Sequence, residues 1–489
     1  MTPTRTTNRI LDNIRQRRRR AVTAVAIAGM LTLGACTTSS SEAAEPTADS
    51  AAPSETVDTV ETVDATSDAA ASGELFDSSM VHSISVEFDD ADYDAMIETF
   101  TTTGDKDWIS AEVVIDGETY ESVGLRLKGN SSLFGLSAET ATDPEELPWL
   151  IDLNEYVDGQ DHDGVDEIVI RSNSTETGMN EAVAQELLSL TGLASQEAIA
   201  TSFTVNGDTA LRLAVENPDG TWHDANFEDQ DGLLYKADSE GDYSYRGDDP
   251  EAYADAFDQE AGDDDLTPLI EFLDFINNSD DATFAADLPD VLDVDAFATY
   301  LAYQDLIGNN DDIDGRGNNS YLEYDTTIDQ FTVVSWDLNL AFGTANTNVG
   351  GGGGPAGGDQ VGGGAGRPAG GPPGAVDGEL PVGGPPAAVD GELPVGGPPA
   401  GGAGGVGGAG AGAGGSNILV ERFMANDEFA ALYAQKTEDL TELLFTSGTL
   451  DEVIADWSDV LIDEASDLVS QETVAAEAAA LTAYADQVR

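Results

Sequence analysis

Two neighbouring stretches decide how this chain folds. Residues 309–322 read NNDDIDGRGNNSYL, and residues 331–343 read FTVVSWDLNLAFG. The short apolar runs at 320–324 and 331–336 predict strands, and the apolar spacing of residues 294–307 just before them predicts a helix. A helix, a polar loop and two strands that end beside carboxylates and amides therefore form the predicted centre of an α+β domain.

The same periodicities extend the domain in both directions. Further strands are predicted at 83–88, 149–153, 168–171 and 233–236, and hairpins at 111–127 and 201–216, whose Asp-Gly and Asn-Gly pairs suit tight turns. Helical spacing occurs at 91–100, 180–190 and 266–307, and again throughout 417–489. We therefore predict an α+β fold with a mixed or antiparallel sheet in residues 76–343 and a helical C-terminal part in residues 417–489.

The segment between these two parts has a different composition. Residues 344–416 are mostly Gly, Pro and Ala, and a 13-residue unit at 375–387 is repeated without change at 388–400. A phosphate-binding glycine loop is excluded, because the segment has no Gly-Lys-Ser/Thr and Arg367 is its only basic residue. We interpret it as a flexible insertion that interrupts one domain.

The first 75 residues have the features of an export signal and a tether. Arginines at 15 and 17–20 precede an apolar stretch at 21–33, which is too short for a permanent membrane span. Residues 33–36 read LGAC, which resembles the lipobox of bacterial lipoproteins, and Cys36 is the only cysteine. The resemblance implies a signal peptide at 1–36, a lipid on Cys36 and an extracytoplasmic, membrane-anchored location at the cell surface. Residues 37–75 have almost no large apolar groups, so we expect a disordered tether.

The charge of the chain excludes two classes of partner. Seven of the 19 basic residues and one of the 94 acidic ones lie in residues 1–36, which leaves 12 basic residues against 93 acidic ones. Nucleic acids and anionic lipid headgroups are polyanions that proteins bind through Lys and Arg, so neither is expected as a partner. Such acidity suits a salt-rich medium that screens self-repulsion.

The residues of the central loop suggest several kinds of chemistry. Phosphoryl transfer needs a carboxylate that orients the attacking hydroxyl and oxygen ligands for Mg²⁺. Asp314 and Asn319 are five residues apart, like the catalytic Asp and metal-binding Asn of protein kinases, and Asp337 follows a strand as the second metal-binding Asp does there. The spacing is equally compatible with a calcium loop or a solvated acidic turn. His82, His162 and His223 lack metal-ligand spacing, and we expect them at the surface.

Several motifs in order resemble the CotH kinase family. The loop and strand described above are similar to that family's Asn-x-Asp...Asn-Asn-x-Tyr-Leu and Trp-Asp-Leu-Asp/Asn-x-x-Phe-Gly motifs. Residues 124–132, GLRLKGNSS, resemble its Arg-x-Lys-Gly-Asn-Ser block, and 215–216, 234–236 and 417–433 resemble further parts. The resemblance covers roughly 80–343 and 417–489. It implies an atypical protein-kinase-like fold and ATP-dependent phosphorylation of Ser or Thr in exported proteins.

The resemblance also implies roles for individual residues. Phosphate binding falls to the cations Arg126, Lys128 and Lys236, with Glu216 orienting one of them. Asp314 or Asp312 accepts the hydroxyl proton, with Asp311 as a further alternative, and the ligands of Mg²⁺ or Mn²⁺ are Asn319, Asp337 and Asn339. Two family cations are missing, around 148–153 and at 179–180. The alternative is therefore a catalytically silent or Ca²⁺-stabilised surface binding module on the same fold.

Overall fold

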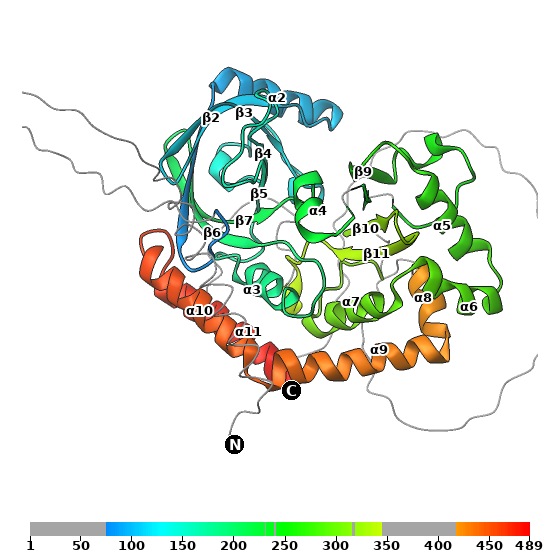
Figure 1. The fold of residues 1–489 in the computed structure, drawn as a ribbon. Coiled ribbons are helices and arrows are strands. Elements are labelled where there is room, and N and C mark those ends of the chain that lie inside the picture. The colour runs from blue at the N-terminus through cyan, green and yellow to red at the C-terminus, as the bar shows by residue number, and fades with distance from the viewer. Residues whose placement is uncertain (1–74, 230, 239–240, 315–317, 345–416) are drawn as a thin grey trace, which may run out of the picture. The chain divides into compact units, whose positions relative to one another are not determined.

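A computed structural model describes residues 75–229, 231–238, 241–314, 318–344 and 417–489 (Figure 1). This part contains two sheets and a set of helices, which confirms the predicted α+β class with helices in the C-terminal part. The described residues before 345 and after 416 belong to one compact unit. The predicted signal peptide and its Cys36, the tether and the Gly-rich insertion lie outside the described residues, apart from their ends at 75 and 344.

The first sheet is a closed barrel of seven strands. Their order around the barrel is β1 (Val81–Glu87), β2 (Ile109–Ile115), β3 (Glu118–Leu127), β4 (Trp149–Asp152), β5 (Glu167–Ile170), β7 (Asp208–Glu216) and β6 (Ala198–Val205). All neighbours are antiparallel except β1 and β6, whose parallel pairing closes the barrel. Periodicity predicted these strands, but it did not predict closure, because closure joins strands more than 100 residues apart.

Local turn chemistry sets the two hairpins of the barrel. Asp116 and Gly117 have φ of 46° and 89°, and Asn206 and Gly207 have φ of 48° and 100°. Positive φ at both central residues belongs to the turn type whose twist matches that of paired strands. Alternate side chains then point inward, and Val113, Ile115 and other apolar residues fill the barrel.

The second sheet is antiparallel and has the order β11 (Gln330–Ser335), β10 (Ser320–Asp325), β8 (Leu233–Ala237) and β9 (Phe257–Ala261). Three helices follow β9: α5 (Thr267–Asn278), α6 (Asp281–Val291) and α7 (Val294–Ile307). Helix α7 is buried nearly all round, and its residues take part in two of the hydrophobic cores. The first residues of the loop that follows, 309–314, lie against α7, because the backbone amide of Ile313 donates to the hydroxyl of Tyr300 in that helix.

The remaining helices lie beside the barrel or in the C-terminal part of the chain, and the C-terminal helices pack on earlier ones. The barrel region also carries α2 (Asp90–Thr103), α3 (Met179–Leu188) and α4 (Gly220–Asn226). The C-terminal part contains α8 (Ile418–Ala425), α9 (Asp427–Leu440), a π-helix (Thr441–Thr446), α10 (Thr449–Glu464) and α11 (Gln471–Val488). Helix α9 packs on α7 and α10 packs on α3 (Figure 1). No helix within the described ranges is long and apolar enough to cross a bilayer.

An aromatic and aliphatic layer lies between the outer face of the barrel and the second sheet. The barrel contributes Leu150 and Val169, and the second sheet contributes Leu234, Tyr321 and Val334. Trp222, Ala261 and Trp336 complete the buried part of this cluster. Two of the cations predicted from the sequence border this layer, since Lys128 lies 5.6 Å from the ring centroid of Trp336 and Arg126 lies 4.8 Å from that of Trp108.

Candidate functional site

Asp337 lies just beyond the end of β11, in a conformation that few residues adopt. Its φ is 58°, in the left-handed region that costs non-glycine residues roughly 1 kcal/mol or more. Its carboxylate accepts a hydrogen bond from the guanidinium of Arg171, which follows β5. Nε of the same arginine lies 3.0 Å from the carboxylate of Glu181 in α3. Asp337 is thus tied to the barrel and to α3 at once.

Burial and opposite charges act against each other in this triad. Burial raises the pKa of the Glu181 carboxyl, and the charge of Arg171 opposes that shift. The pKa of Arg171 is raised, because its two carboxylate partners outweigh the effect of burial. The guanidinium therefore stays charged and keeps Asp337 oriented.

The loop before β10 places a second carboxylate near Asp337. Asn319, with φ of 57°, donates from Nδ2 to the backbone carbonyl of Asp311 at 2.9 Å. Burial raises the pKa of Asp311, the negative charge of Asp337 raises it further, and a hydrogen bond from Asn319 lowers it. Asn319 therefore contacts Asp311, and Asp337 lies near enough for its charge to act on the Asp311 carboxyl.

The other two aspartates of the loop face α7 instead. The side chain of Asp312 accepts from the backbone amide of Asp314 at 3.0 Å, and burial raises its pKa to about 7. Burial also raises the pKa of Asp314, and Asp305 of α7 adds to the shift of both carboxyls. Of the three aspartates that the sequence left open, Asp311 is the one that Asp337 influences.

The predicted phosphate-binding cations come from both sheets, Arg126 and Lys128 from the end of β3 and Lys236 from β8. Lys128 donates from Nζ to Asn217 Oδ1 at 2.6 Å, and Nζ of Lys236 lies 3.4 Å from Glu260. Burial lowers the pKa of Lys128, and the charges of Lys236 and Arg126 lower it further. Burial, Arg126 and Lys236 likewise lower the pKa of Lys106. Three lysines and an arginine thus repel one another in a chain that has a large excess of acidic residues.

Carboxylates accompany these cations. Glu167 accepts from Asn217 Nδ2, and its pKa is raised by burial and lowered by the charge of Lys128. Burial also raises the pKa of Asp219 to about 7, and the charge of Glu167 contributes. The cluster is therefore a mixed one, in which burial favours the neutral form of both signs of charge.

The ring of Trp336 connects the two groups. Its centroid lies 5.6 Å from Lys128 Nζ and 5.7 Å from Arg171 Cζ. Because Arg171 holds Asp337, this indole borders both the lysine cluster and the group of Asp337, Asp311 and Asn319. Lys128, Asn319 and Asp337, predicted from separate motifs, are in this way brought together.

Two predicted residues lie apart from these contacts. Glu216, at the end of β7, accepts from the backbone amide of Glu197 at 2.7 Å, and burial raises its pKa to about 7. The acidic partners of the two lysines are other residues. Glu167 and Glu260 act on Lys128, and Glu260 lies beside Lys236. Asn339 lies two residues beyond Asp337, and its carbonyl accepts from Asn180 Nδ2 at 2.6 Å.

Sequence reasoning missed Lys106, Arg171, Glu181 and Asn217. A signal for Arg171 was present, because basic residues are rare here and this one directly follows an apolar strand. Arg171 provides a buried cation next to α3. The family resemblance had indicated that a cation was missing there, at residues 179–180. Glu181 and Asn217 had no such signal, since their partners lie far away in sequence.

The expected surface position of the histidines is wrong. His82, His162 and His223 are only 1%, 4% and 1% exposed. His82 bonds to Asp116 at 2.6 Å, His162 bonds to Tyr120 at 2.8 Å, and His223 stacks on Phe227. Within the described part of the chain, no group of three or more His, Cys, Asp or Glu side chains is arranged to hold a metal ion.

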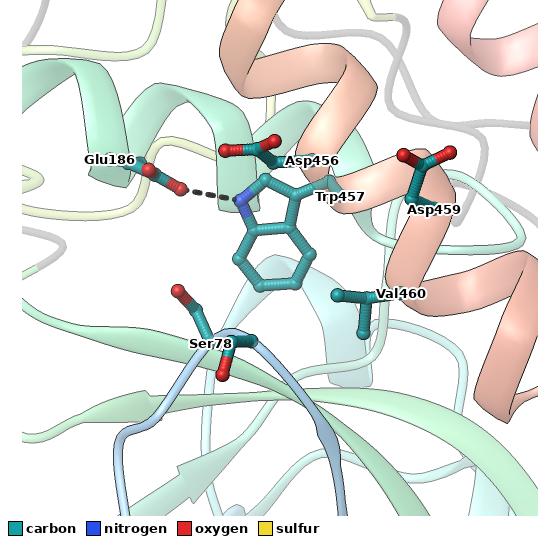
Figure 2. Close-up of a pocket in the computed structure, with 7 residues that line it drawn as sticks. Ser78, Glu186, Asp456, Trp457, Asp459 and Val460 are labelled. Atoms are coloured by element: carbon teal, nitrogen blue, oxygen red, sulfur yellow. Dashed lines mark hydrogen bonds between the residues drawn. The ribbon is translucent and has the colours of Figure 1, made fainter. Parts of the chain in front are cut away.

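A surface cavity of about 200 Å³ lies at another place, between α3, α10 and residues 78–79. Figure 2 shows the indole of Trp457 in its wall, donating to Glu186 at 2.9 Å. Asp456, Asp459 and Val460 also line it. None of the candidate residues described above lines this cavity, so we do not assign it to the site.

Comparison with known protein families gives a match over most of the chain. The family model described as CotH kinase protein matches residues 125–488. Comparison with curated proteins gave no significant match.

Proposed function

Because the chain belongs to the CotH kinase family, we propose that it is an exported kinase that transfers the γ-phosphate of ATP to Ser or Thr hydroxyls of extracytoplasmic proteins. The observation that carries this proposal is the position of Trp336. The ring centroid of Trp336 lies 5.6 Å from Lys128 Nζ and 5.7 Å from Arg171 Cζ, and Arg171 holds Asp337. A cation suited to phosphate and a carboxylate suited to a metal ion are therefore both linked to one residue, Lys128 directly and Asp337 through Arg171.

The lysine cluster supports phosphate binding. Burial lowers the pKa values of Lys106 and Lys128, and the nearby charges of Arg126 and Lys236 lower them further. A polyanionic ligand would relieve this repulsion, because the phosphate charges favour the protonated amines. We infer that these side chains hold the phosphate oxygens of ATP.

The donor set suits Mg²⁺ or Mn²⁺. Magnesium is usually held by one or two carboxylates together with substrate phosphates, so a preformed cage of protein ligands is not needed. Asp337 offers a carboxylate, and Asn319, whose Nδ2 is used on Asp311, offers its amide oxygen. Asn339 is a further candidate ligand. The bound ion would neutralise charge that develops on the phosphate oxygens.

Asp311 is the proposed base. The substrate hydroxyl oxygen would bond to the γ-phosphorus while the bond from that phosphorus to the leaving oxygen of ADP breaks, and the hydroxyl proton would pass to the Asp311 carboxylate. The raised pKa of Asp311 suits this role, because a base is more effective when its pKa lies nearer the working pH. Asp312 and Asp314 are less suited, since they face Asp305 of α7.

The cell-surface location is proposed from the sequence of residues 1–36. A lipid on Cys36 would anchor the chain to the outer face of the cytoplasmic membrane. A Cys36→Ala protein should then move from the membrane fraction to the soluble exported fraction. Unchanged membrane association would show that another feature binds the membrane.

The catalytic proposal is tested with single substitutions of the loop aspartates. Full-length protein is incubated with labelled ATP, Mg²⁺ or Mn²⁺, salt and a Ser-containing acceptor. Asp311→Asn should lower transfer by about 10²- to 10⁴-fold, the usual contribution of a general base, while ATP still binds. Asp312→Asn and Asp314→Asn are matched controls and should retain transfer. If the wild type neither binds ATP nor transfers phosphate, and Ca²⁺ raises its melting temperature, the calcium-stabilised binding module is the better function.

A further inference from the structure

Tyr321 has a buried hydroxyl group that the fold itself does not use. The residue lies in β10, its side chain is 0% exposed, and its hydroxyl has no hydrogen-bond partner among the described residues. Its ring meets that of Trp336 edge-on, with centroids 5.8 Å apart. Tyr321 thus contacts the indole that connects the two halves of the candidate site.

Strand register places Tyr321 beside the lysine cluster. It lies directly opposite Lys236 of β8, and Lys236 lies opposite Asp258 of β9. Residues directly opposite in antiparallel strands project from the same face of the sheet, with Cβ atoms roughly 5 Å apart. Tyr321, Lys236 and Asp258 therefore form one row that faces the same way.

The barrel provides a second unused donor next to this row. Nε of Arg126 is buried and has no acceptor among the described residues, although its guanidinium lies over the ring of Trp108 at 4.8 Å. Arg126 is opposite Leu150 in the barrel, and Leu150 shares the aromatic layer with Tyr321. The charge of Arg126 acts on both Lys128 and Asp258. Both unused donors therefore border the same cluster.

The surroundings of Tyr321 keep it a hydrogen-bond donor. Burial, together with the charges of Glu260, Glu167, Asp219 and Asp258, raises its pKa far above the usual value, so the phenol retains its proton. A buried donor without an acceptor is costly, and native proteins rarely leave one unsatisfied. Two such donors beside four cations fit a ligand that offers only acceptor oxygens and negative charge.

We propose that Tyr321 is a positioning residue for the phosphate chain of the nucleotide, and that its hydroxyl donates a hydrogen bond to a phosphate oxygen next to Arg126 Nε. This inference rests on the proposed nucleotide site and adds a neutral donor to its four cations. A phenol hydroxyl donates one hydrogen bond to an oxyanion, in one direction. An ammonium group has three N–H donors and a full charge, so it attracts an oxyanion from many directions. Tyr321 would therefore fix where the phosphates lie, and the lysines would supply most of the attraction.

The test is Tyr321→Phe, which removes only the hydroxyl. Its matched control is Tyr324→Phe in the same strand, where the hydroxyl donates to Asp329 at 3.0 Å instead. Full-length wild type and both variants are titrated with Mg·ATP and, separately, with inorganic pyrophosphate. Tyr321→Phe should bind both ligands about tenfold more weakly, the loss expected for a hydrogen bond to a charged group. Its ligand-free melting temperature should not fall, because no internal bond is lost. Tyr324→Phe should bind like the wild type.

Each outcome bears on a stated claim. Equal affinities of the wild type and Tyr321→Phe, or a melting temperature lowered by several degrees without ligand, would overturn the role of Tyr321 alone. If the wild type binds pyrophosphate but does not bind Mg·ATP, the kinase proposal is refuted. The effect of Tyr321→Phe could then still be measured as a change in pyrophosphate affinity. A wild type that binds neither ligand would overturn both. Where transfer is measurable, Tyr321→Phe should raise KM for ATP more than it lowers kcat.

Discussion

At the scale of single residues, buried carboxylates make the stability of this protein depend on pH. Glu216 is the clearest case, because burial raises its pKa from 4.5 to about 7 and one backbone amide is its hydrogen-bond partner. The folded state then holds a proton that the unfolded state releases. The contribution of Glu216 to stability is therefore complete below about pH 4.5 and is lost as the pH rises to about 7 and beyond.

Glu216→Gln should remove this dependence. Glutamine keeps an oxygen for the amide of Glu197 but cannot ionise, so at pH 8 the variant should be more stable than the wild type by about 1–2 kcal/mol, a discounted value for a partly buried group. At pH 4 the two should be equal. Urea unfolding at both pH values measures the difference. Glu112→Gln, at an exposed position of β2, controls for the loss of a charge; an equal gain there would show that burial of Glu216 is not the cause.

The sequence predicted only some residues of the candidate site, and the reason is geometric. Asp337, Asn319 and Lys128 belong to separate ordered motifs, so each could be identified without the fold. Spacing could not choose among three aspartates within four residues. The choice depends on the backbone of the loop, where Asn319 at positive φ bonds back to Asp311. Arg171 was missed because its importance comes from Asp337, 166 residues away.

At the scale of elements, the end of α7 is fixed by a contact with α11. Gly308 ends α7 with φ of 64°, and a Cβ there would lie 2.3 Å from the hydroxyl oxygen of Tyr484. Gly448, before α10, has φ of 95°, but a Cβ there would meet nothing within 4 Å. The two glycines share a left-handed conformation and differ in packing.

Alanine at these two positions should separate the two effects. Gly448→Ala should lower the free energy of unfolding by about 1 kcal/mol, which is the backbone penalty alone. Gly308→Ala should lower it by about 2–4 kcal/mol, because overpacking against Tyr484 adds to the backbone penalty. Adding Tyr484→Phe to Gly308→Ala should recover part of the loss. Thermal unfolding of the three variants provides the comparison. Equal losses of stability at 308 and 448 would mean that α11 or the Tyr484 side chain moves aside for the added methyl group without a measurable penalty.

Elements with local signals were predicted, and those that depend on distant partners were not. The hairpins β2–β3 and β6–β7 carry their turn residues with them, and α2, α3 and α7 have clear apolar spacing. Strand β9 reads FDQEA, with too few apolar residues to be recognised, and it exists because β8 pairs with it. The parallel pairing of β1 with β6, which makes a barrel from an expected sheet, has no local sequence signal.

At the scale of the whole molecule, the segment 345–416 divides the sequence of one compact unit. Deleting residues 350–414 should leave the melting temperature and ATP affinity nearly unchanged, because the entropy of loop closure changes only logarithmically with loop length, by about 1–2 kcal/mol here. The segment also has few large apolar residues to bury. Calorimetry and a nucleotide titration check this. A lost unfolding transition would show that the deleted residues support the fold.

The contact between α3 and α10 has a consequence for when this protein can acquire its structure. Trp457 donates to Glu186, and the two residues are 271 positions apart. The core that they border includes residues 179–188 together with residues 440–485, so it stays incomplete until almost the entire chain has been synthesised. Barrel strands can pair much earlier, but the apolar side of α3 must wait. A ribosome stalled near residue 440 would therefore hold an incompletely folded nascent chain that exposes the apolar side of α3. Chaperones that bind exposed apolar surfaces should associate with the chain at that stage and dissociate once the last helices have emerged.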